Sequence, residues 1–184
     1  MAGTVLVAGG SRGIGAAICR SAAAGGYKIA INYNASPDAA EKLAKEIVAG
    51  GGEAIAVGAD VTNEADVLSM FEEVDTRLGR LPALVNNAGG SRFKEAPVGN
   101  QLVDSPMVQI AGIIALNLTS AVICSREAVK RMSAKLGGSG GVIVNISSDC
   151  ARRGGPPYRK DGVKNLVLYG AAKAGENQGY SVAT

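Results

Sequence analysis

Short apolar runs alternate along this chain with longer segments in which apolar residues recur every three or four positions. The runs are rich in β-branched residues and are bounded by glycine, proline or polar residues, which predicts buried strands. The longer segments have the spacing of amphipathic helices. Predicted strands cover residues 4–8, 28–33, 54–57, 81–86 and 142–146, and predicted helices cover 16–24, 37–48, 62–78 and 107–132. Strands that alternate with helices are typical of βαβ units, so we predict an α/β fold with a parallel sheet.

Length and composition fit one folded domain over residues 1–184. Of the 184 residues, 47% are hydrophobic and 19% are charged, a balance typical of folded rather than disordered chains. No stretch approaches the roughly 18 apolar residues that cross a bilayer, so we expect no membrane partner and a cytoplasmic location. A net charge of +3, 4% aromatic residues and no tryptophan argue against a nucleic-acid partner.

The cysteines do not indicate a metal site. Cys19, Cys124 and Cys150 are widely separated, and the chain has no histidine. This set is too small for a structural zinc site, so we expect reduced, buried thiols and no metal.

Charge separates two regions of the chain. Residues 1–150 carry 13 Lys and Arg against 14 Asp and Glu, whereas residues 151–184 carry 6 against 2. We therefore distinguish a regular core, residues 1–149, from a divergent tail, residues 150–184, and we expect a loop over residues 90–106.

A glycine-rich turn follows the first predicted strand. Its residues are Gly9-Gly10-Ser11-Arg12-Gly13-Ile14-Gly15, and they lead into the small apolar residues of the first helix. Because no Cβ is in the way, backbone N–H groups of such a turn approach a phosphate closely, and the following helix directs its positive end towards the same anion. The turn indicates a dinucleotide pyrophosphate site, although glycines alone also suit a simple strand-to-helix corner.

Polar residues also follow three later strands. Asp60 follows the third strand, Asn86-Asn87-Ala88-Gly89 follow the fourth, and Ser147-Ser148 follow the fifth. In a doubly wound sheet, ligands bind outside the carboxyl ends of the strands, near the point where the strand order reverses. We therefore expect these residues and the glycine turn to meet in one crevice.

With these motifs the chain resembles the short-chain dehydrogenase/reductase family, in particular its branch of β-ketoacyl-carrier-protein reductases and glucose dehydrogenases. The family's Thr-Gly-x-x-x-Gly-x-Gly motif is similar to residues 8–15, and its Asn-Asn-Ala-Gly motif matches residues 86–89. Its Tyr-x-x-x-Lys motif matches residues 169–173, its helix asparagine falls on Asn117, and its strand serine falls on Ser148. The resemblance implies a Rossmann-type doubly wound parallel sheet in three α/β/α layers, with strand order 3-2-1-4-5.

The resemblance also implies NAD(P)-dependent interconversion of a ketone and a secondary alcohol. Tyr169 and Lys173, four residues apart on a helix, would share a face, where the ammonium favours the ionised phenol. Tyr169 would serve as general acid in reduction and as base in oxidation, while Ser148 holds the substrate oxygen. By family analogy, Lys173 also holds the nicotinamide ribose and Asn117 holds a water. Each residue also has a structural explanation, as a chance helical pair, a turn-capping serine or an amide bonded to backbone.

The end of the second strand favours NADP(H) over NAD(H). An acidic residue there would bind the ribose hydroxyls of NAD and repel a 2′-phosphate, but the chain has neutral residues at this position. Arg12 can face the additional phosphate, unless it is an ordinary solvated charge. Asp60 and Val61 resemble the family's adenine-contacting pair, although Asp60 can instead cap the helix that begins near Thr62. The candidate cofactor-binding residues are Gly9, Ser11, Arg12, Gly13, Ile14, Gly15, Tyr33, Asn34, Ser36, Asp60, Val61, Asn87, Ala88, Gly89, Tyr169 and Lys173.

The chain also departs from the family pattern. The family's last strands and much of its usual dimer interface have no counterpart in residues 1–184, and the spacing from Ser148 to Tyr169 is longer than usual. Residues 175–179 are polar and glycine-broken where the helix should continue. The fifth strand is then an exposed edge that invites pairing, so we consider a homo-oligomer or a partner chain that supplies the missing parts.

Two functions remain open at this point. The first is an NADP(H)-dependent oxidoreductase for a small-molecule ketone or alcohol, with Asn117, Ser148, Tyr169 and Lys173 as catalytic residues. The alternative is a catalytically impaired NADP-binding module or subunit with a degenerate substrate site.

Overall fold

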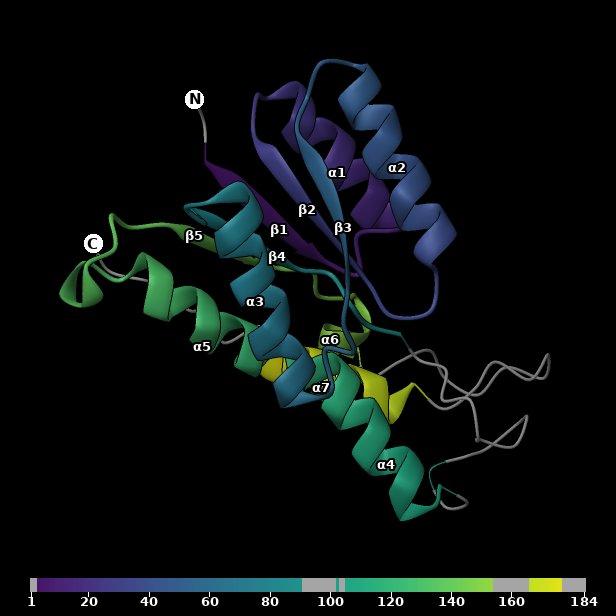
Figure 1. Cartoon of the computed structure of the whole chain (residues 1–184). Helices are drawn as coiled ribbons and strands as arrows, with labels where there is room; N and C mark the ends of the chain where they lie inside the picture. The colour runs from purple at the N-terminus through teal and green to yellow at the C-terminus, as the bar shows by residue number, and fades with distance from the viewer. Residues whose placement is uncertain (1–2, 91–101, 103–104, 154–165, 177–184) are drawn as a thin grey trace.

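Five parallel strands form the centre of the fold (Figure 1). The computed structural model describes residues 3–90, 102, 105–153 and 166–176. β1 (Thr4–Ala8) lies between β2 (Lys28–Tyr33) and β4 (Ala83–Asn86), and β3 (Ala54–Gly58) and β5 (Val142–Asn145) form the two edges. The order β3-β2-β1-β4-β5 confirms the predicted topology. The strand order reverses between β1 and β4, which is the place where sheets of this type bind ligands.

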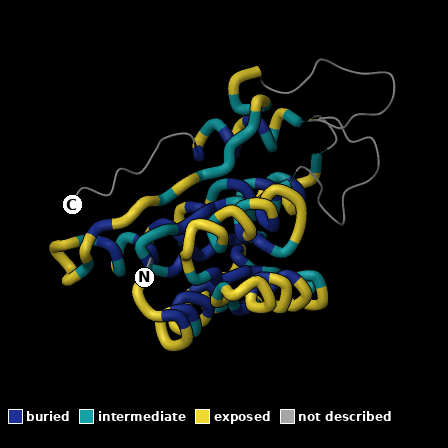
Figure 2. Tube along the Cα trace, turned by 90° about the horizontal axis from the view of Figure 1, so that it is seen from above, coloured by how far each residue is buried: buried dark blue, intermediate teal, exposed yellow. Residues whose placement is uncertain are grey.

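Helices cover both faces of this sheet and complete three layers. α1 (Gly13–Ala24) and α2 (Pro37–Ala49) lie on one face, and α3 (Glu64–Leu78) and α5 (Ser120–Met132) lie on the other (Figures 1 and 2). Side chains of β1 alternate between the two layers, as expected of a strand. Leu6 packs with α3 and α5, whereas Val5 and Val7 pack with α1 and α2. All five residues of β1 are buried, so the sheet centre is a rigid support for the loops at its carboxyl end.

β5 is an exposed edge of the described sheet, as the sequence predicted. Val142 and Val144, which point to one face, are 52% and 43% exposed. Ile143, between them, points to the other face and packs against the core cluster beneath α3 and α5. One face of β5 is therefore open to solvent while the other is covered.

The start of α3 differs from the prediction. Asn63 caps this helix, because its Oδ1 accepts a hydrogen bond from the Ala65 N–H at 2.9 Å. The capping role considered for Asp60 is therefore wrong. The Asp60 carboxylate instead accepts hydrogen bonds from the N–H and the hydroxyl of Thr62, at 2.9 and 2.7 Å, and closes a local turn before the helix.

The predicted helix over residues 107–132 is continuous but not uniform. It consists of α4 (Met107–Ile114), a π-helical turn η2 (Ala115–Thr119) and α5. The π-helical turn carries Asn117, whose side chain is fully buried. Such turns are rare and frequently occur at functional sites. Hydrophobic spacing predicted the helix but not this local change of its winding.

By length and composition, the helical run Met107–Met132 could cross a membrane, since an 18-residue window within it has a mean hydropathy of 1.9. The expectation that no stretch has this character is therefore wrong. One such helix is a weak indication, because core helices of globular proteins pass the same test. Cys124, Ala128 and Met132 of this run are buried in the core cluster that α3 and β4 share, which is the packing of a core helix.

The described part of the tail forms two helices. α6 (Cys150–Arg153) is one short turn, and α7 (Val167–Glu176) packs against α4, η2 and α6. The break expected from residue 175 is wrong for its first two residues, because α7 continues through Gly175 and Glu176. A Cβ on Gly175 would lie 3.2 Å from both methyl groups of Leu118, so packing favours glycine there. Most of the predicted loop (91–101 and 103–104), most of the basic segment (154–165) and residues 177–179 lie outside the described residues.

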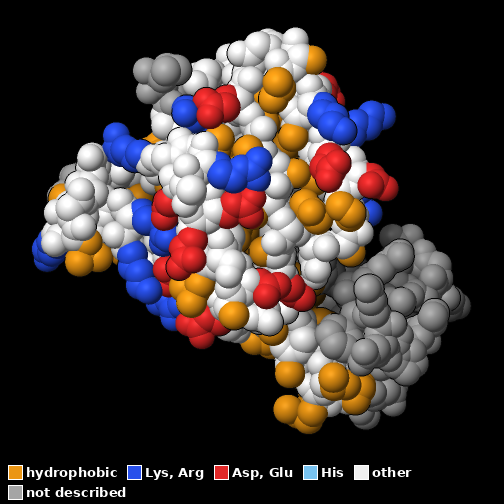
Figure 3. All heavy atoms as spheres, in the orientation of Figure 1, with side chains coloured by type: hydrophobic (Ala, Val, Ile, Leu, Met, Phe, Trp, Pro, Cys, Tyr) orange, Lys and Arg blue, Asp and Glu red, His pale blue; other side chains and the backbone are white. Residues whose placement is uncertain are grey.

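Charged side chains of both signs are mixed over the exposed sides of α3 and α5 (Figure 3). Arg126 pairs with Glu64 at 2.6 Å and joins the two helices. Glu127, beside it, is only 4% exposed and accepts hydrogen bonds from Arg126 and Lys130. Burial acts to raise the pKa of Glu127, but the hydrogen bonds from Lys130 and Arg126 outweigh it and hold this pKa below its usual range. Glu127 is thus an ionised residue in a largely covered position.

Candidate cofactor and active site

A cavity of about 510 Å³ opens at the carboxyl ends of the strands, beside the reversal of the strand order. The glycine turn, the segments that follow β2, β4 and β5, and helix α7 all contribute to its walls. The lining residues are Gly9, Ser11, Arg12, Ile14, Tyr33, Asn34, Ala35, Ser36, Asn87, Ala88, Gly89, Leu116, Ile146, Ser147, Tyr169 and Lys173. Most of the residues predicted to bind a cofactor are therefore in one place, although they come from distant parts of the chain.

The glycine turn has a backbone course that requires glycine. Gly9 has a φ of +66°, and a Cβ on it would lie 2.9 Å from Cα of Ala88. A Cβ on Gly15 would lie 2.3 Å from the Gly9 carbonyl oxygen. The chain doubles back tightly here, so α1 begins at Gly13 rather than at Ala16. The absence of Cβ atoms leaves backbone groups accessible to a ligand.

Two asparagine side chains hold this turn in place. Oδ1 of Asn32, on β2, accepts a hydrogen bond from the Gly9 N–H at 3.0 Å, and its Nδ2 donates to the Ala59 carbonyl at 3.1 Å. Nδ2 of Asn87, after β4, donates to the Gly9 carbonyl at 2.8 Å. Both neighbouring strands therefore position the turn. Beneath it, burial raises the pKa of the Cys19 thiol to about 12, so this cysteine is an inert part of the packing.

The first turn of α1 fits a phosphate group. Arg12 occupies its N-cap position with extended backbone, and no side chain caps the helix. No acidic residue lies in the first turn. Uncapped N–H groups and the positive end of the helix favour an anion at this position. Together with the close glycine contacts, this arrangement fits a dinucleotide pyrophosphate.

The wall formed after β2 contains no carboxylate among its described residues. Tyr33, Asn34 and Ser36 line this part of the cavity. Ser36 occupies the N-cap position of α2 but its hydroxyl makes no capping hydrogen bond, so the hydroxyl is available to a ligand. Arg12 is exposed and has no ion-pair partner within the described part of the chain. The electrostatic environment is therefore neutral to positive.

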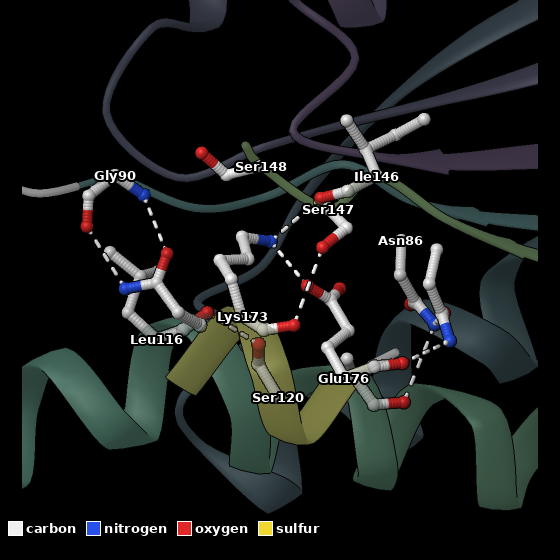
Figure 4. A network of polar contacts seen from close by, with 12 residues as sticks. Asn86, Gly90, Leu116, Ser120, Ile146, Ser147, Ser148, Lys173 and Glu176 are labelled. Carbon is white, nitrogen blue, oxygen red and sulfur yellow. Dashed lines mark hydrogen bonds and ion pairs between the residues drawn. The ribbon is translucent and has the colours of Figure 1, made fainter. Parts of the chain in front are cut away.

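Tyr169 and Lys173 lie on α7 and both line the cavity. The Lys173 side chain is 3% exposed, and its ammonium donates to the Ile146 carbonyl at 2.8 Å and pairs with the Glu176 carboxylate at 2.5 Å (Figure 4). Burial raises the pKa of Glu176 above its usual range, although the Lys173 contact acts in the opposite direction. Glu176 therefore joins the predicted pair Tyr169 and Lys173 as a third residue, which the sequence motifs did not indicate.

The two serines after β5 occupy different environments. Ser147 lines the cavity, and its hydroxyl donates to the Lys173 carbonyl at 3.3 Å. The Ser148 hydroxyl accepts a hydrogen bond from the Cys150 N–H at 3.2 Å and points away from the Lys173 ammonium (Figure 4). Ser148 is not among the described lining residues, so its role in holding a substrate stays a prediction.

The Asn117 side chain is committed to backbone groups. Its Oδ1 accepts from the Gly90 N–H at 2.8 Å, and its Nδ2 donates to the carbonyls of Gly90 and Ile113, at 2.9 Å each. A Cβ on Gly89 would lie 2.8 Å from Asn117 Oδ1 and 3.3 Å from Lys173 Nζ. Asn117 therefore anchors the segment after β4 next to Lys173. Its proposed contact with a water stays a prediction.

The structure leaves some predicted residues outside the cavity and adds others. Asp60 and Val61 do not line it, and Val61 is 4% exposed in the core. Asn32 and Glu176 were missed, although each has a sequence signal. Asn32 is a polar residue within an apolar strand, and Glu176 follows Lys173 at a spacing of three residues on a helix. Ala35, Leu116 and Ile146 are further lining residues that the motifs did not indicate.

Known proteins resemble this chain in sequence and in structure. The profile of the family described as short chain dehydrogenase matches residues 3–181. The chain is 43% identical over 151 residues to an uncharacterized oxidoreductase, YgfF, of Escherichia coli K12, covering 82% of this chain and 59% of that protein. It is 38% identical over 170 residues to a 3-oxoacyl-[acyl-carrier-protein] reductase of Synechocystis, covering 92% and 62%.

A solved structure shows the same fold. The crystal structure of a short chain dehydrogenase from Burkholderia cenocepacia in complex with NADP has a TM-score of 0.81 and 33% identity to this chain, covering 95% of this chain and 64% of that one. The chain thus spans about three-fifths of the length of these relatives.

Proposed function

The chain belongs to the short-chain dehydrogenase family, and on this premise we propose that it binds NADPH and reduces a ketone to a secondary alcohol. One observation carries the proposal. A single cavity unites the glycine turn, a strand end without a carboxylate and the Tyr169–Lys173 pair. Each of these is a separate requirement for the reaction, because the first binds a pyrophosphate, the second admits a 2′-phosphate and the third supplies a proton.

The preference for NADPH rests on charge. Arg12 is exposed beside the first turn of α1, and a guanidinium is well matched to a phosphate. The neutral residues Tyr33, Asn34 and Ser36 do not repel a 2′-phosphate, as an acidic residue would. The relative from Burkholderia cenocepacia, whose crystals contain NADP, supports this choice.

The reaction divides between the cofactor and the chain. When bound, NADPH would supply a hydride to the carbonyl carbon. The Tyr169 hydroxyl donates its proton to the carbonyl oxygen, which completes the alcohol, and Tyr169 regains a proton from solvent. The positive charge of Lys173 stabilises the phenolate that remains on Tyr169 between these steps. Ser147, which faces the cavity, or Ser148 donates a hydrogen bond to the substrate oxygen.

A second function is favoured by two observations. Lys173 is paired with Glu176, and the Ser148 hydroxyl is bonded to the Cys150 N–H. Both groups are directed towards the protein rather than towards a substrate. In this alternative the chain binds NADPH but does not catalyse hydride transfer.

Binding of the cofactor is the first test. We expect saturable binding of NADPH, measured by its fluorescence, and weaker binding of NADH. Replacing Arg12 by Ala should weaken NADPH binding about tenfold or more, since hydrogen bonds to charged groups contribute about 1.5–3 kcal/mol, and should leave NADH binding unchanged. Arg20→Ala is the matched control, because Arg20 lies on the same helix but pairs with Glu46 away from the cavity. A folded protein that binds neither nucleotide would contradict both functions.

Turnover separates the two functions. The name of the Synechocystis relative makes a 3-oxoacyl thioester the first substrate to try. Tyr169→Phe should abolish NADPH oxidation and leave NADPH affinity unchanged, and Ser147→Ala and Ser148→Ala should identify the serine that holds the substrate. NADPH binding without oxidation over a panel of ketones would favour the non-catalytic module.

A further inference from the structure

Glu176 places a buried carboxylate directly on the lysine of the predicted catalytic pair. We propose that Glu176 is a positioning residue, which neutralises the Lys173 ammonium and thereby limits how strongly Lys173 favours the ionised form of Tyr169. The proposal rests on the role given to Tyr169 in the proposed function. Glu176 then controls the pH at which Tyr169 can exchange a proton.

The contact is a built feature of α7. The two side chains are three residues apart on one helix, their charged atoms are 2.5 Å apart, and they are only 3% and 2% exposed. The ammonium also donates a hydrogen bond to the Ile146 carbonyl at 2.8 Å. Solvent therefore screens this pair little, and the ammonium is fixed in position at the cavity wall.

The backbone of Glu176 is held in place as well. The Glu176 carbonyl accepts a hydrogen bond from Nδ2 of Asn145, at 3.4 Å, and Oδ1 of Asn145 accepts one from Asn86 at 2.8 Å. The ends of β4 and β5 are thereby linked to the last turn of α7 (Figure 4). Glu176 does not need to reorganise to meet Lys173.

Pairing changes what Lys173 does to its neighbours. A lone ammonium acts on a phenol one helical turn away as a full positive charge, which favours the phenolate. An ammonium with a carboxylate in contact acts as a dipole, whose effect decreases more steeply with distance because the two charges largely cancel. Tyr169 therefore experiences less positive charge than the sequence motif alone implies.

Few other charges in the described part of the chain face this pair. α4 and η2, which pack against α7, contain no ionisable side chain. On the α6 side, Asp149 pairs with Arg152 and Arg153 at 3.0 Å each, next to Cys150. Across the cavity, the ionisable lining residues are Arg12 and Tyr33. Within the described residues, Glu176 is the carboxylate in contact with Lys173, so it is the side chain to change.

The ionisation of Tyr169 can be measured without turnover. The full chain is labelled with tyrosine carrying ¹³C at Cζ, its NMR signals are followed against pH, and Tyr169 is identified by its loss in Tyr169→Phe. In Glu176→Gln we expect the midpoint of the Tyr169 titration to move about one pH unit lower, the size typical of one nearby charge. Glu46→Gln is the matched control, since it removes the same charge from an exposed ion pair between α1 and α2, and should leave the midpoint unchanged.

A second variant decides the question if Glu176→Gln does not fold. Lys173→Met combined with Glu176→Leu replaces both charges by apolar groups of similar size, a change that buried ion pairs often tolerate. If the wild-type pair is electrically neutral towards Tyr169, this double variant should titrate within about 0.3 pH units of the wild type. A midpoint at least one unit higher in the double variant, or no shift in a folded Glu176→Gln, would overturn the proposal.

The outcomes of the two proposals can be told apart. A wild-type chain that binds NADPH but does not oxidise it contradicts the catalytic function, while the Tyr169 titration still tests Glu176. If the chain is active, the midpoint of its pH–rate profile should shift in Glu176→Gln in the same direction and by the same amount as the Tyr169 signal. A change in rate at every pH without a change in midpoint would indicate a structural role only.

Discussion

Asn32 connects three elements beneath the cofactor cavity, and its replacement by Ala should destabilise the fold and loosen the glycine turn together. The side chain is 2% exposed and lies on β2. It accepts from the Gly9 N–H and donates to the Ala59 carbonyl at the end of β3. Alanine keeps the backbone but removes both hydrogen bonds, so the groups that they satisfied are left without this partner.

The magnitude follows from the burial of those groups. Ala59 is 6% exposed, and leaving a buried carbonyl unsatisfied costs about 1–3 kcal/mol. Gly9 is only partly buried, so water can replace part of its lost hydrogen bond, and we assign it about 1 kcal/mol. The free energy of unfolding should therefore fall by about 2–4 kcal/mol, a large part of the total of about 5–15 kcal/mol for a typical domain.

Urea unfolding followed by circular dichroism measures this loss. With a slope of about 1–3 kcal/mol per molar urea, the midpoint should fall by about 1 M or more. Asn34→Ala is the control, because Asn34 is exposed, makes no hydrogen bond within the described residues and should cost less than about 0.5 kcal/mol. NADPH affinity, measured where Asn32→Ala is still folded, should also fall. Equal midpoints for the two variants would refute the reasoning.

Three further predictions concern other parts of the molecule. Glu127→Gln should lower the free energy of unfolding near neutral pH. The folded state lowers the pKa of Glu127, so the wild type should be more stable than the variant above the unfolded pKa of about 4.3, and this difference should be lost as pH falls below that value. Urea titrations at several pH values measure the difference in the free energy of unfolding, and a difference that grows in acid would contradict the prediction. Val144→Lys, on the 43% exposed edge, should change stability by less than about 0.5 kcal/mol and reduce self-association in sedimentation velocity; unchanged association would show that this edge is not responsible. Burial raises the pKa of Cys19 and Cys124 to about 12, so thiol labelling followed by mass spectrometry should modify the half-buried Cys150 first, and rapid labelling of Cys19 would contradict the packing below the glycine turn.

Much of the fold was predictable because its signals are local. Hydrophobic spacing within each segment indicated all five strands and the helices between them, and the structure confirms their order in the sheet. The glycine turn was also predictable, since the absence of a Cβ permits the same tight backbone course wherever the turn lies in the fold. Tyr169 and Lys173 share a helical face because of a spacing of four residues, which any helix would produce.

Other features depend on contacts between residues far apart in the chain. Hydrophobic spacing did not predict the π-helical turn at Asn117. It also did not predict that α7 continues through Gly175, where the helix packs closely against Leu118. The helical part of the tail is covered by α4 and η2, and this burial outweighs the weak helix propensity of glycine.

The site shows the same division between sequence and tertiary structure. The amino-acid sequence by itself determined the residue types around the cavity, because motifs specify chemistry and local geometry. Only the tertiary structure decided that Ser147 rather than Ser148 lines the cavity and that Asn117 bonds to backbone. It also placed Ile146, 27 residues before Lys173 in the chain, against the ammonium that Glu176 neutralises. The physical reason is that every element packed around a side chain influences the direction in which it points and the charge that it experiences. This environment forms only when the whole chain has folded.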